Sequence, residues 1–457
     1  MTNLNRHPAS FRDPSGFIYE KDGTVFRFIS ETYSPHFQKF ISSGLYTELV
    51  KKNYLLPFEV VNENHTGQSD WLTTLLPLQI PFLNYAWEWS FEQLKDAALT
   101  TLAICKSSLD KGMILKDATH FNIQFVNGKP LLIDTLSFEL YEEGSQWIAY
   151  RQFCECFLNP LLLAKYCKME AHKLLLAYPD GVPSSLTSQW LPLSSKLNVS
   201  VLLHVHIHAK VGTKKNNNKD VREKPFSKKN LLNILQNLED CILKLKPHAA
   251  VTNWNNYYAE TILSNEYLTE KKQIVTSWLK TIPYKSVLDL GANDGEFSML
   301  CAKEAFVVAA DFDSSCISNL YTKLKTKKLS NITPLVLDVI YPSPSIGWLN
   351  KEHPSFFSRK NFDLCLALAL IHHLVISKNI TLDMLATFFA ERCNFLLIEF
   401  VPKTDPKIIE MLHWRKDIFQ SYTLENFETT FSVHFTIQQK TIVTNSLRTL
   451  YLLQKKA

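Results

Sequence analysis

Short apolar runs separated by amphipathic or polar stretches dominate the second half of the chain. Five of these runs have the length of a strand, and the segments between them are long enough for crossover helices. They are residues 286–290, 306–310, 332–337, 363–370 and 395–400, and a closing pair follows at 433–441 and 448–453. This order predicts an α/β fold with a Rossmann-like, seven-stranded sheet that ends in an antiparallel pair.

The first half shows a different order of patterns. Asp22-Gly23 separates two apolar-aromatic runs, which predicts a β-hairpin. Apolar residues at helical spacing predict helices over 31–52 and 90–111, and a second hairpin turns at Asn127-Gly128. Residues 140–209 are expected to be mainly helical. This mixture predicts an α+β domain.

The distribution of charged residues indicates a boundary between the two halves of the chain. The net charge is +5, but residues 210–230 hold seven Lys and one Arg against one Asp and one Glu, which is 8 − 2 = +6. The rest of the chain therefore carries 5 − 6 = −1. This Asn/Lys-rich stretch predicts a linker, with domains at 1–209 and 231–457. Because the basic residues gather in a linker, no nucleic-acid partner is expected.

Bulk composition fits a globular protein, with 46% hydrophobic and 20% charged residues. The longest clean apolar run, Leu364–Ile371, is far shorter than the roughly 20 residues that a membrane span needs. The N-terminus has no apolar signal-peptide core, and the nine cysteines show no framework spacing. We therefore expect a cytoplasmic protein with reduced thiols. His204, His206 and His208 would share one face of a strand but spread around a helix, and no metal site is expected.

Residues 286–297, SVLDLGANDGEF, combine a buried strand with a glycine turn and the start of a helix. Glycine occurs only 12 times in 457 residues, so Gly291 and Gly295 within five positions indicate a tight turn or a close approach to a ligand. Unpaired N–H groups at the start of the helix can face that ligand. The dinucleotide-binding fingerprint G-x-G-x-x-G does not fit Gly291-x-x-x-Gly295.

This stretch resembles the first motif of class I S-adenosylmethionine-dependent methyltransferases. Their usual pattern is hydrophobic-hydrophobic-Asp-x-Gly-x-Gly-x-Gly, and Asn293 stands here at the middle glycine. The resemblance implies S-adenosyl-L-methionine as cofactor. Its methionine part would lie against the turn, whose candidate binding residues are Asp289, Gly291, Ala292, Asn293 and Gly295.

Acidic residues follow the next two predicted strands. Asp311 lies twenty residues after Gly291, at a position where a carboxylate can accept both ribose hydroxyls. Asp313 is the second candidate for this role. Asp338 follows the third strand, and the resemblance implies a place near the adenine amino group. In the resembled family the region before the first strand folds over the cofactor, so Tyr258 is a candidate cover, with ordinary packing as the alternative.

His372 and His373 come just after the fourth predicted strand, beside the expected transfer site. Methyl transfer depends mainly on positioning, but a histidine can accept a proton if the acceptor must lose one. Both are candidate catalytic residues, and packing or capping at the strand end is the alternative. Glu399 and Asp363 are weaker candidates for the same cleft.

The stretch GMILKDATHFNIQFVNGKPLLIDTLSFE carries a second chemical pattern. Asp117, Asn122 and Asp134 have the order and nearly the spacing of a catalytic base and two magnesium ligands in phosphoryl transfer. The stretch resembles the catalytic and metal loops of kinase-like folds. It departs from them in Leu115-Lys116, in Thr135-Leu136 and in the absence of a glycine-rich phosphate loop, with Arg27 roughly where a lysine is expected. An ordinary α+β domain is the alternative.

The whole chain resembles a bacterial family of two-part class I methyltransferases, some members of which carry nodulation-protein labels. The resembling segments are FRDPSGFIYEKDG, LKDATHFNIQF, PLLIDTLSFE, LDLGANDGEF, LALALIHHL, LIEFVPK and RTLYLL. The resemblance implies methyl transfer to a small molecule or glycan, with a protein acceptor as a weaker choice. The alternatives are a bifunctional kinase–methyltransferase and a regulatory scaffold that binds cofactor or ATP without turnover.

Overall fold

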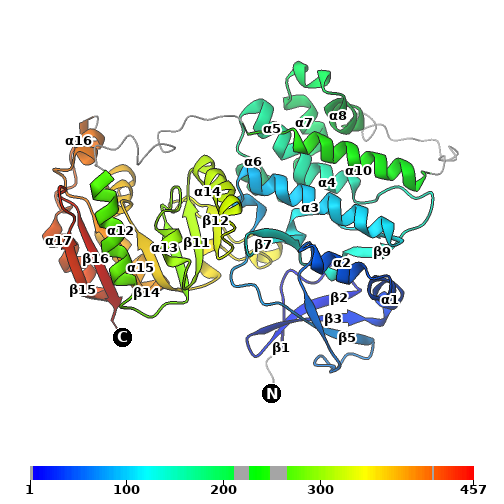
Figure 1. Ribbon diagram of the computed structural model, residues 1–457, viewed down its shortest axis with the longest axis horizontal. Helices are drawn as coiled ribbons and strands as arrows, with labels where there is room; N and C mark the ends of the chain where they lie inside the picture. Colours follow the sequence, from blue (N-terminus) through cyan, green and yellow to red (C-terminus); the bar gives the residue numbers. More distant parts are fainter. Residues whose placement is uncertain (1–3, 210–225, 248–264, 414–415, 457) are drawn as a thin grey trace. The chain divides into compact units, whose positions relative to one another are not determined.

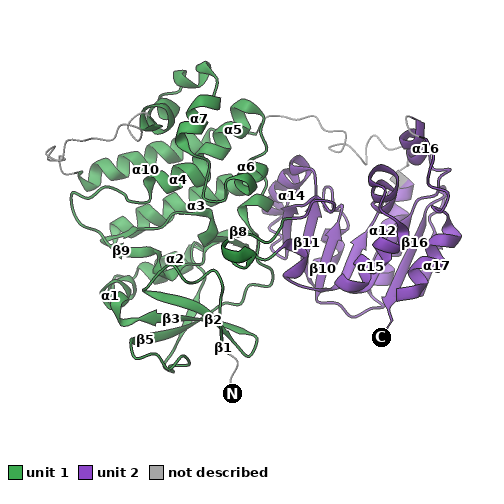
Figure 2. Cartoon of the chain, turned by 180° about the vertical axis from the view of Figure 1, so that it is seen from behind, with its two compact units in different colours: residues 1–249, 343–354 green, residues 250–342, 355–457 purple. Residues whose placement is uncertain are grey.

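The computed structural model describes residues 4–209, 226–247, 265–413 and 416–456. The chain forms two compact units (Figure 2). Unit 1 comprises Met1–Ala249 and Ser343–Pro354, and unit 2 comprises Ala250–Pro342 and Ser355–Ala457. Tyr258 and most of the predicted linker lie outside the described residues. No helix in the described ranges is both long and apolar enough to cross a bilayer.

Unit 1 begins with an antiparallel sheet in the order β1-β2-β3-β5-β4. The strands are β1 Leu4–Arg6, β2 Gly16–Lys21, β3 Thr24–Ser30, β4 Phe58–Val61 and β5 Trp71–Pro77. The predicted hairpin joins β2 to β3, and both Asp22 and Gly23 take positive φ at its turn. The helix predicted over 31–52 is divided into α1 Ser34–Ser42 and α2 Leu45–Lys51, because Gly44 has a φ of 78° between them.

Helices form most of the remainder of unit 1 (Figure 1). The predicted long helix is α3 Phe91–Asp110, which begins at a capping box made by Ser90 and Gln93. α10 Lys228–Leu243 packs along α3, so this helix belongs to unit 1 although the sequence predicted a second domain from residue 231. Further helical segments include α4 Tyr150–Phe153, η5 Cys154–Leu158, α5 Asn159–Cys167, α6 Ala171–Ala177, α7 Ser184–Trp190, α8 Val199–Val201 and η7 Leu202–Ile207.

The predicted phosphotransfer residues lie next to two small antiparallel pairs in unit 1, in the segments that precede or follow their strands. β7 Ile123–Val126 pairs with β8 Lys129–Leu132, and β6 Met113–Leu115 pairs with β9 Phe138–Leu140. His204 and His206 lie on η7, and His204 Nε2 bonds Asn237 while His206 bonds Ser188 and Ser195. These histidines are therefore packed into a helical region and do not line one face of a strand.

The segment Ser343–Pro354 joins unit 1 although it lies in sequence between two strands of unit 2. Glu352 anchors it, since its carboxylate accepts two hydrogen bonds from Arg12, at 2.6 and 2.8 Å, and one from the Trp348 backbone N–H. The His353 ring stacks on Phe121 with 4.7 Å between centroids. Sequence reasoning missed this placement, because nothing local in the segment indicates its distant partners.

Unit 2 contains a sheet in the order β12-β11-β10-β13-β14-β16-β15. β10 Ser286–Leu290, β11 Phe306–Asp311, β12 Ile332–Val336, β13 Phe362–Ala367 and β14 Cys393–Phe400 are parallel, whereas β16 Thr449–Lys455 and β15 Phe435–Ile442 complete it antiparallel. The helices are α12 Asn265–Leu279, α13 Ser298–Cys301, α14 Ser314–Lys327, α15 Leu382–Arg392, α16 Pro406–His413 and α17 Leu424–His434. The carboxyl ends of five parallel strands thus share one edge, where open α/β sheets bind ligands.

Candidate functional site

The glycine turn after β10 has the conformation that the sequence predicted. Gly291 and Gly295 both have φ of 75°, and Asn293 between them has φ of 49°. The N–H groups of Gly291 and Ala292 both bond the Ala310 carbonyl on the neighbouring strand, at 2.9 and 3.0 Å. A Cβ at Gly295 would lie 2.5 Å from Leu320 Cδ1 on α14, so the second glycine allows the turn to pack against that helix.

Asp311, the last residue of β11, accepts a hydrogen bond from the backbone of this turn. Its Oδ2 accepts the Asn293 N–H at 2.9 Å, and its Oδ1 accepts the Asp313 N–H at the same distance. The side chain is buried, and burial raises the pKa of Asp311 to about 6. Each carboxylate oxygen keeps a second lone pair, so this group can still accept hydrogen bonds from a ligand.

The other acidic candidates lie along the same edge. Burial raises the pKa of Asp289 to about 7, although Ser298 Oγ donates to it at 2.5 Å. Asp313 caps α14 through Oδ1, while its buried Oδ2 has no hydrogen-bond partner among the described residues. Asp338 is half-buried after β12 and accepts the Ile340 N–H at 2.9 Å. β10, β11 and β12 are neighbours in the sheet, so the structure brings Asp289, Asp311 and Asp338 to one edge.

His372 and His373 follow β13 at this edge, and their ring centroids lie 4.1 Å apart. His372 is fully buried, and neither of its ring nitrogens has a hydrogen-bond partner within the described part of the chain. A buried polar group left in this state costs about 1–3 kcal/mol, which marks a place where a ligand or water can bind. Burial lowers the pKa of His373 to about 4 and that of His372 well below its usual value.

Sequence reasoning missed a buried charged cluster beside the histidines. Lys271 on α12 pairs with Glu399 on β14 at 2.7 Å, and Tyr267 also donates to that carboxylate. Arg448 pairs with Asp405 at 2.8 Å. Only Glu399 was among the predicted cleft residues. In sequence, Lys271 looks like an exposed position in a polar helix, and only the fold reveals its burial.

Asp363 does not belong to this edge. It is the second residue of β13, and its carboxylate accepts N–H groups from Lys285 and Ser286 at 2.9 Å each. These residues lie where β10 begins, so the weaker prediction that Asp363 enters the cleft is wrong. Ser286 Oγ also donates to the Asp363 carboxylate, and this hydrogen bond joins the amino ends of β10 and β13.

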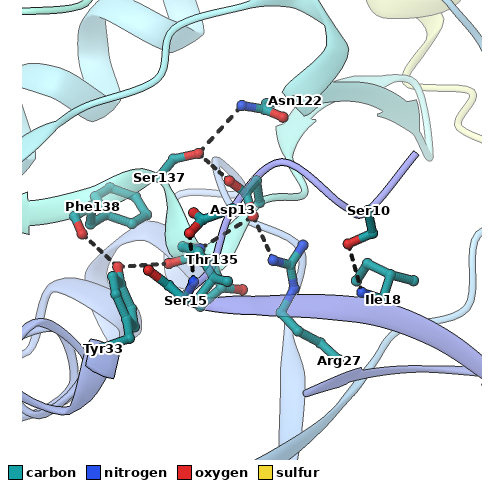
Figure 3. A network of polar contacts seen from close by, with 12 residues as sticks. Ser10, Asp13, Ser15, Ile18, Arg27, Tyr33, Asn122, Thr135, Ser137 and Phe138 are labelled. Atoms are coloured by element: carbon teal, nitrogen blue, oxygen red, sulfur yellow. Dashed lines mark hydrogen bonds and ion pairs between the residues drawn. The ribbon is translucent and has the colours of Figure 1, made fainter. Parts of the chain in front are cut away.

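In unit 1, Arg27, Asn122 and Ser137, which come from three separate segments, lie close together (Figure 3). Arg27 Nη1 on β3 lies 2.6 Å from Asp134 Oδ1, and Ser137 Oγ donates to Asp134 Oδ2 at 2.5 Å. Asn122 donates its side-chain N–H to the same Ser137 hydroxyl at 3.3 Å. The structure therefore brings Asn122 and Asp134 together, with Arg27 as a third member.

Asp117 precedes this group in the chain and accepts the Thr119 N–H at 3.2 Å. Burial, and then the charge of Asp134, raises the pKa of Asp117. Its neighbour Lys116 pairs with Asp13 at 3.3 Å. Within the described ranges, no set of three or more His, Cys, Asp or Glu side chains is arranged to hold a metal ion.

No protein-family model matches the chain. Among curated proteins, Nodulation protein NoeA of Rhizobium meliloti (strain 1021) is 31% identical over 462 residues, which cover 98% of this chain and 96% of NoeA. The chain belongs to the NoeA family. The alignment spans both units.

Methyltransferases occur among solved structures that resemble part of this NoeA-family chain. Magnesium protoporphyrin IX methyltransferase (ChlM) from Synechocystis PCC 6803 has a TM-score of 0.33 at 16% identity, over 44% of this chain and 93% of its own. The N-methyltransferase NodS from Bradyrhizobium japonicum WM9 has a TM-score of 0.32 at 11% identity, over 45% and 100%. WbdD has a TM-score of 0.31 at 17% identity, over 45% and 43%. Likeness at this level assigns no activity by itself.

Proposed function

We propose that this NoeA-family chain is an S-adenosyl-L-methionine-dependent methyltransferase whose cofactor lies at the carboxyl edge of the unit 2 sheet. The observation that carries the proposal is the left-handed turn from Gly291 to Gly295, which Asp311 closes through the Asn293 N–H. The glycines of this turn let a ligand approach the backbone closely, and the adjacent Asp311 carboxylate can take a ribose.

The side chains present fit such a cofactor. Asp311, with the unpartnered Oδ2 of Asp313 behind it, would accept the ribose hydroxyls, and Asp338 would lie near the adenine. The turn residues Gly291 to Gly295 would face the methionine part. When bound, the cofactor would supply an electrophilic methyl group. His372 or His373 would take the proton of the acceptor, which we propose to be a small molecule or glycan, with a protein as the weaker choice.

Calorimetric titration of the full chain with S-adenosylhomocysteine tests this proposal. We expect binding by the wild type and at least a tenfold loss of affinity in Asp311→Asn, which keeps the shape of the side chain but removes its charge. Asp363→Asn is the matched control, because Asp363 bonds backbone N–H groups at the opposite end of β13. Absence of binding to the folded wild type, or equal loss in both variants, would contradict the proposed site.

Phosphoryl transfer in unit 1 is a second candidate function, favoured by the convergence of Asn122 and Asp134 on Ser137. Their oxygen atoms are the ligand type that Mg²⁺ prefers, and Asp117 would orient the acceptor hydroxyl. Arg27 already occupies one oxygen of Asp134, so a metal would have to share that carboxylate with a guanidinium. Magnesium-dependent ATP binding by the full chain that is lost in Asp134→Asn would support this candidate, and ATP binding unaffected by Mg²⁺ would oppose it.

A further inference from the structure

Aliphatic side chains are exposed on two neighbouring helical segments of unit 1. The segment η6 Leu193–Leu197 precedes α8 and η7, which together form one continuous helical stretch over 199–207. The most exposed aliphatic residues of these segments are Leu193 at 77%, Leu197 at 87%, Val199 at 66%, Leu203 at 47% and Ile207 at 44%. Single exposed aliphatic residues need no explanation, whereas a concentration of them indicates a surface that binds a partner.

The helical stretch 199–207 has the reverse of the usual polarity. An ordinary surface helix buries its apolar side and exposes its polar side. Here Val199, Leu203 and Ile207, spaced by four along the helix, face outward, whereas His204 and His206 are only 5% and 3% exposed. Burial of polar rings and exposure of aliphatic chains on one helix is the informative departure from a water-facing surface.

Hydrogen bonds hold both buried histidines in place. His204 bonds the Tyr150 hydroxyl through Nδ1 at 2.7 Å and Asn237 Oδ1 on α10 through Nε2 at 2.9 Å. His206 Nε2 lies 2.9 Å from the Ser195 hydroxyl on η6, and its Nδ1 bonds a second serine at 2.8 Å. Since all four ring nitrogens have partners, these bonds fix which side of the helix faces inward and attach η6 to η7.

The charge of the same part of the chain indicates which partner fits this surface. Residues 181–209 contain one lysine, Lys196, and no Asp or Glu, and the Lys-rich stretch 210–230 with its charge of +6 comes next in sequence. A membrane surface with anionic lipids complements this combination, because its acyl boundary accepts aliphatic side chains and its headgroups attract Lys and Arg. A second copy of the chain would bring the same positive charge and would be repelled.

We propose that Leu193, Leu197, Val199, Leu203 and Ile207, here called the aliphatic surface, dock unit 1 on a bilayer that contains anionic lipids. The helical stretch 199–207 would lie along the membrane plane, because it is far shorter than the roughly 20 residues that a span requires. The aliphatic surface belongs to unit 1 and the proposed cofactor site to unit 2, so this inference stands independently of methyl transfer.

Flotation of the full chain with lipid vesicles tests the proposal. Vesicles of phosphatidylcholine with about 30% phosphatidylglycerol are compared with vesicles of phosphatidylcholine alone. We expect the wild type to bind the anionic vesicles at least about tenfold more tightly than the neutral ones. Raising the salt concentration to about 0.5 M should weaken binding to the anionic vesicles, because salt screens the attraction between lysines and headgroups.

Paired variants test whether the aliphatic surface makes the contact. Leu193→Ser/Leu197→Ser should lower affinity for anionic vesicles at least about fivefold, because it removes apolar side chains that enter the membrane. Val60→Ser/Leu78→Ser is the matched control, since these residues of unit 1 are 53% and 48% exposed outside the aliphatic surface, and it should bind as the wild type does. Circular dichroism establishes that each variant is folded.

A charge reversal provides a second test that leaves the aliphatic side chains in place. Lys196→Glu lies between the two leucines of η6 and should lower affinity for anionic vesicles at least about threefold. Lys51→Glu, at an exposed lysine at the end of α2, is its control and should have a smaller effect.

Absence of binding by the folded wild type to anionic vesicles would overturn the inference. Equal binding to anionic and neutral vesicles would also overturn it, as would equal losses in the serine variants and their control. Sedimentation of the same preparations covers the other occupant. Self-association of the wild type that is lost in Leu193→Ser/Leu197→Ser, without vesicle binding, would assign the aliphatic surface to a second copy of the chain and contradict membrane docking.

Discussion

Two groups of carboxylates, one around Asp134 in unit 1 and one beside the glycine turn in unit 2, are in opposite electrostatic situations. In unit 1, Asp134 pairs with Arg27 and Asp13 pairs with Lys116. In unit 2, Asp289 and Asp311 receive their hydrogen bonds from a hydroxyl and from backbone N–H groups. The paired carboxylates of unit 1 have cations in contact, whereas burial raises the pKa of both unit 2 carboxylates.

This difference indicates what each group needs in order to be stable. A carboxylate that already has a guanidinium partner contributes to the fold without any ligand. A buried carboxylate with only neutral donors is less stable as an anion, and ligand hydroxyl groups would stabilise it. The comparison therefore favours unit 2 as the place where an uncharged, hydroxyl-bearing group such as a ribose binds.

Removing Arg27 should produce the largest loss of stability. Arg27→Met leaves the Asp134 carboxylate without its cation, and the two side chains are only 10% and 20% exposed. We expect about 3 kcal/mol less free energy of unfolding for unit 1, measured by urea denaturation of the full chain. Lys52→Met, at an exposed pair with Glu48, should cost less than about 1 kcal/mol.

The double variant Arg27→Met/Asp134→Asn sharpens this prediction. It removes the uncompensated charge, so much of the lost stability should return. A double variant no more stable than Arg27→Met would show that the ion pair does not explain the effect. The Asp134 carboxylate would then not depend on its cation for stability, and in this respect it would resemble Asp289 and Asp311 of unit 2.

Gly295→Ala should have the next largest effect. The alanine Cβ would lie 2.5 Å from Leu320 Cδ1 and would require a φ of 75°, for a cost of about 2–3 kcal/mol in the unfolding of unit 2. Gly291→Ala has the same φ, but its nearest contact is Leu370 Cδ1 at 3.4 Å, so it should cost about 1 kcal/mol. Equal destabilisation by the two variants would show that packing against α14 does not require the second glycine.

Local sequence patterns predicted much of the fold because the elements concerned are determined by interactions between residues that are close in sequence. The Asp22-Gly23 hairpin, the α3 stripe and the strand–turn–helix at Gly291 all depend on neighbours in sequence. The burial of Lys271 and the place of Ser343–Pro354 depend on partners more than a hundred residues away. Hydrophobic periodicity carries no information on such pairs, so these features of the site and fold emerged only from the structure.

The acidic edge of unit 2 should make cofactor affinity depend on pH. A ribose that donates to Asp311 binds the ionised carboxylate, whose pKa in the folded protein without ligand is raised to about 6. Affinity for S-adenosylhomocysteine should thus be constant above about pH 7 and fall towards tenfold per unit below about pH 6. Calorimetry from pH 5 to pH 8 measures this, and Asp311→Asn should bind weakly with a flatter profile.

The same raised pKa values give the folded unit a stability with the opposite dependence on pH. Asp289 and Asp311 have folded pKa values of about 7 and about 6, above the roughly 3.9 of an unfolded aspartate. Between about pH 4 and pH 7 the folded state binds more protons than the unfolded state, so these two groups make unit 2 less stable as the pH rises. Thermal melting without ligand should show this slope, and saturating S-adenosylhomocysteine should reduce it. A smaller ligand-free slope of the same sign in Asp311→Asn, with Asp289 still present, would confirm that the carboxyl group of Asp311 is a source of the effect.

The smallest expected effect concerns the amino end of the same sheet. Asp363→Asn keeps a side chain able to accept the N–H groups of Lys285 and Ser286, so it should cost less than about 1 kcal/mol of stability. Because this residue lies at the end of β13 opposite to His372, affinity for S-adenosylhomocysteine should change less than about twofold. Calorimetry and urea denaturation of the same preparation measure both values. A large loss of affinity in Asp363→Asn would mean that ligand binding is not confined to the carboxyl edge, and the contrast between the two units would then lose its basis.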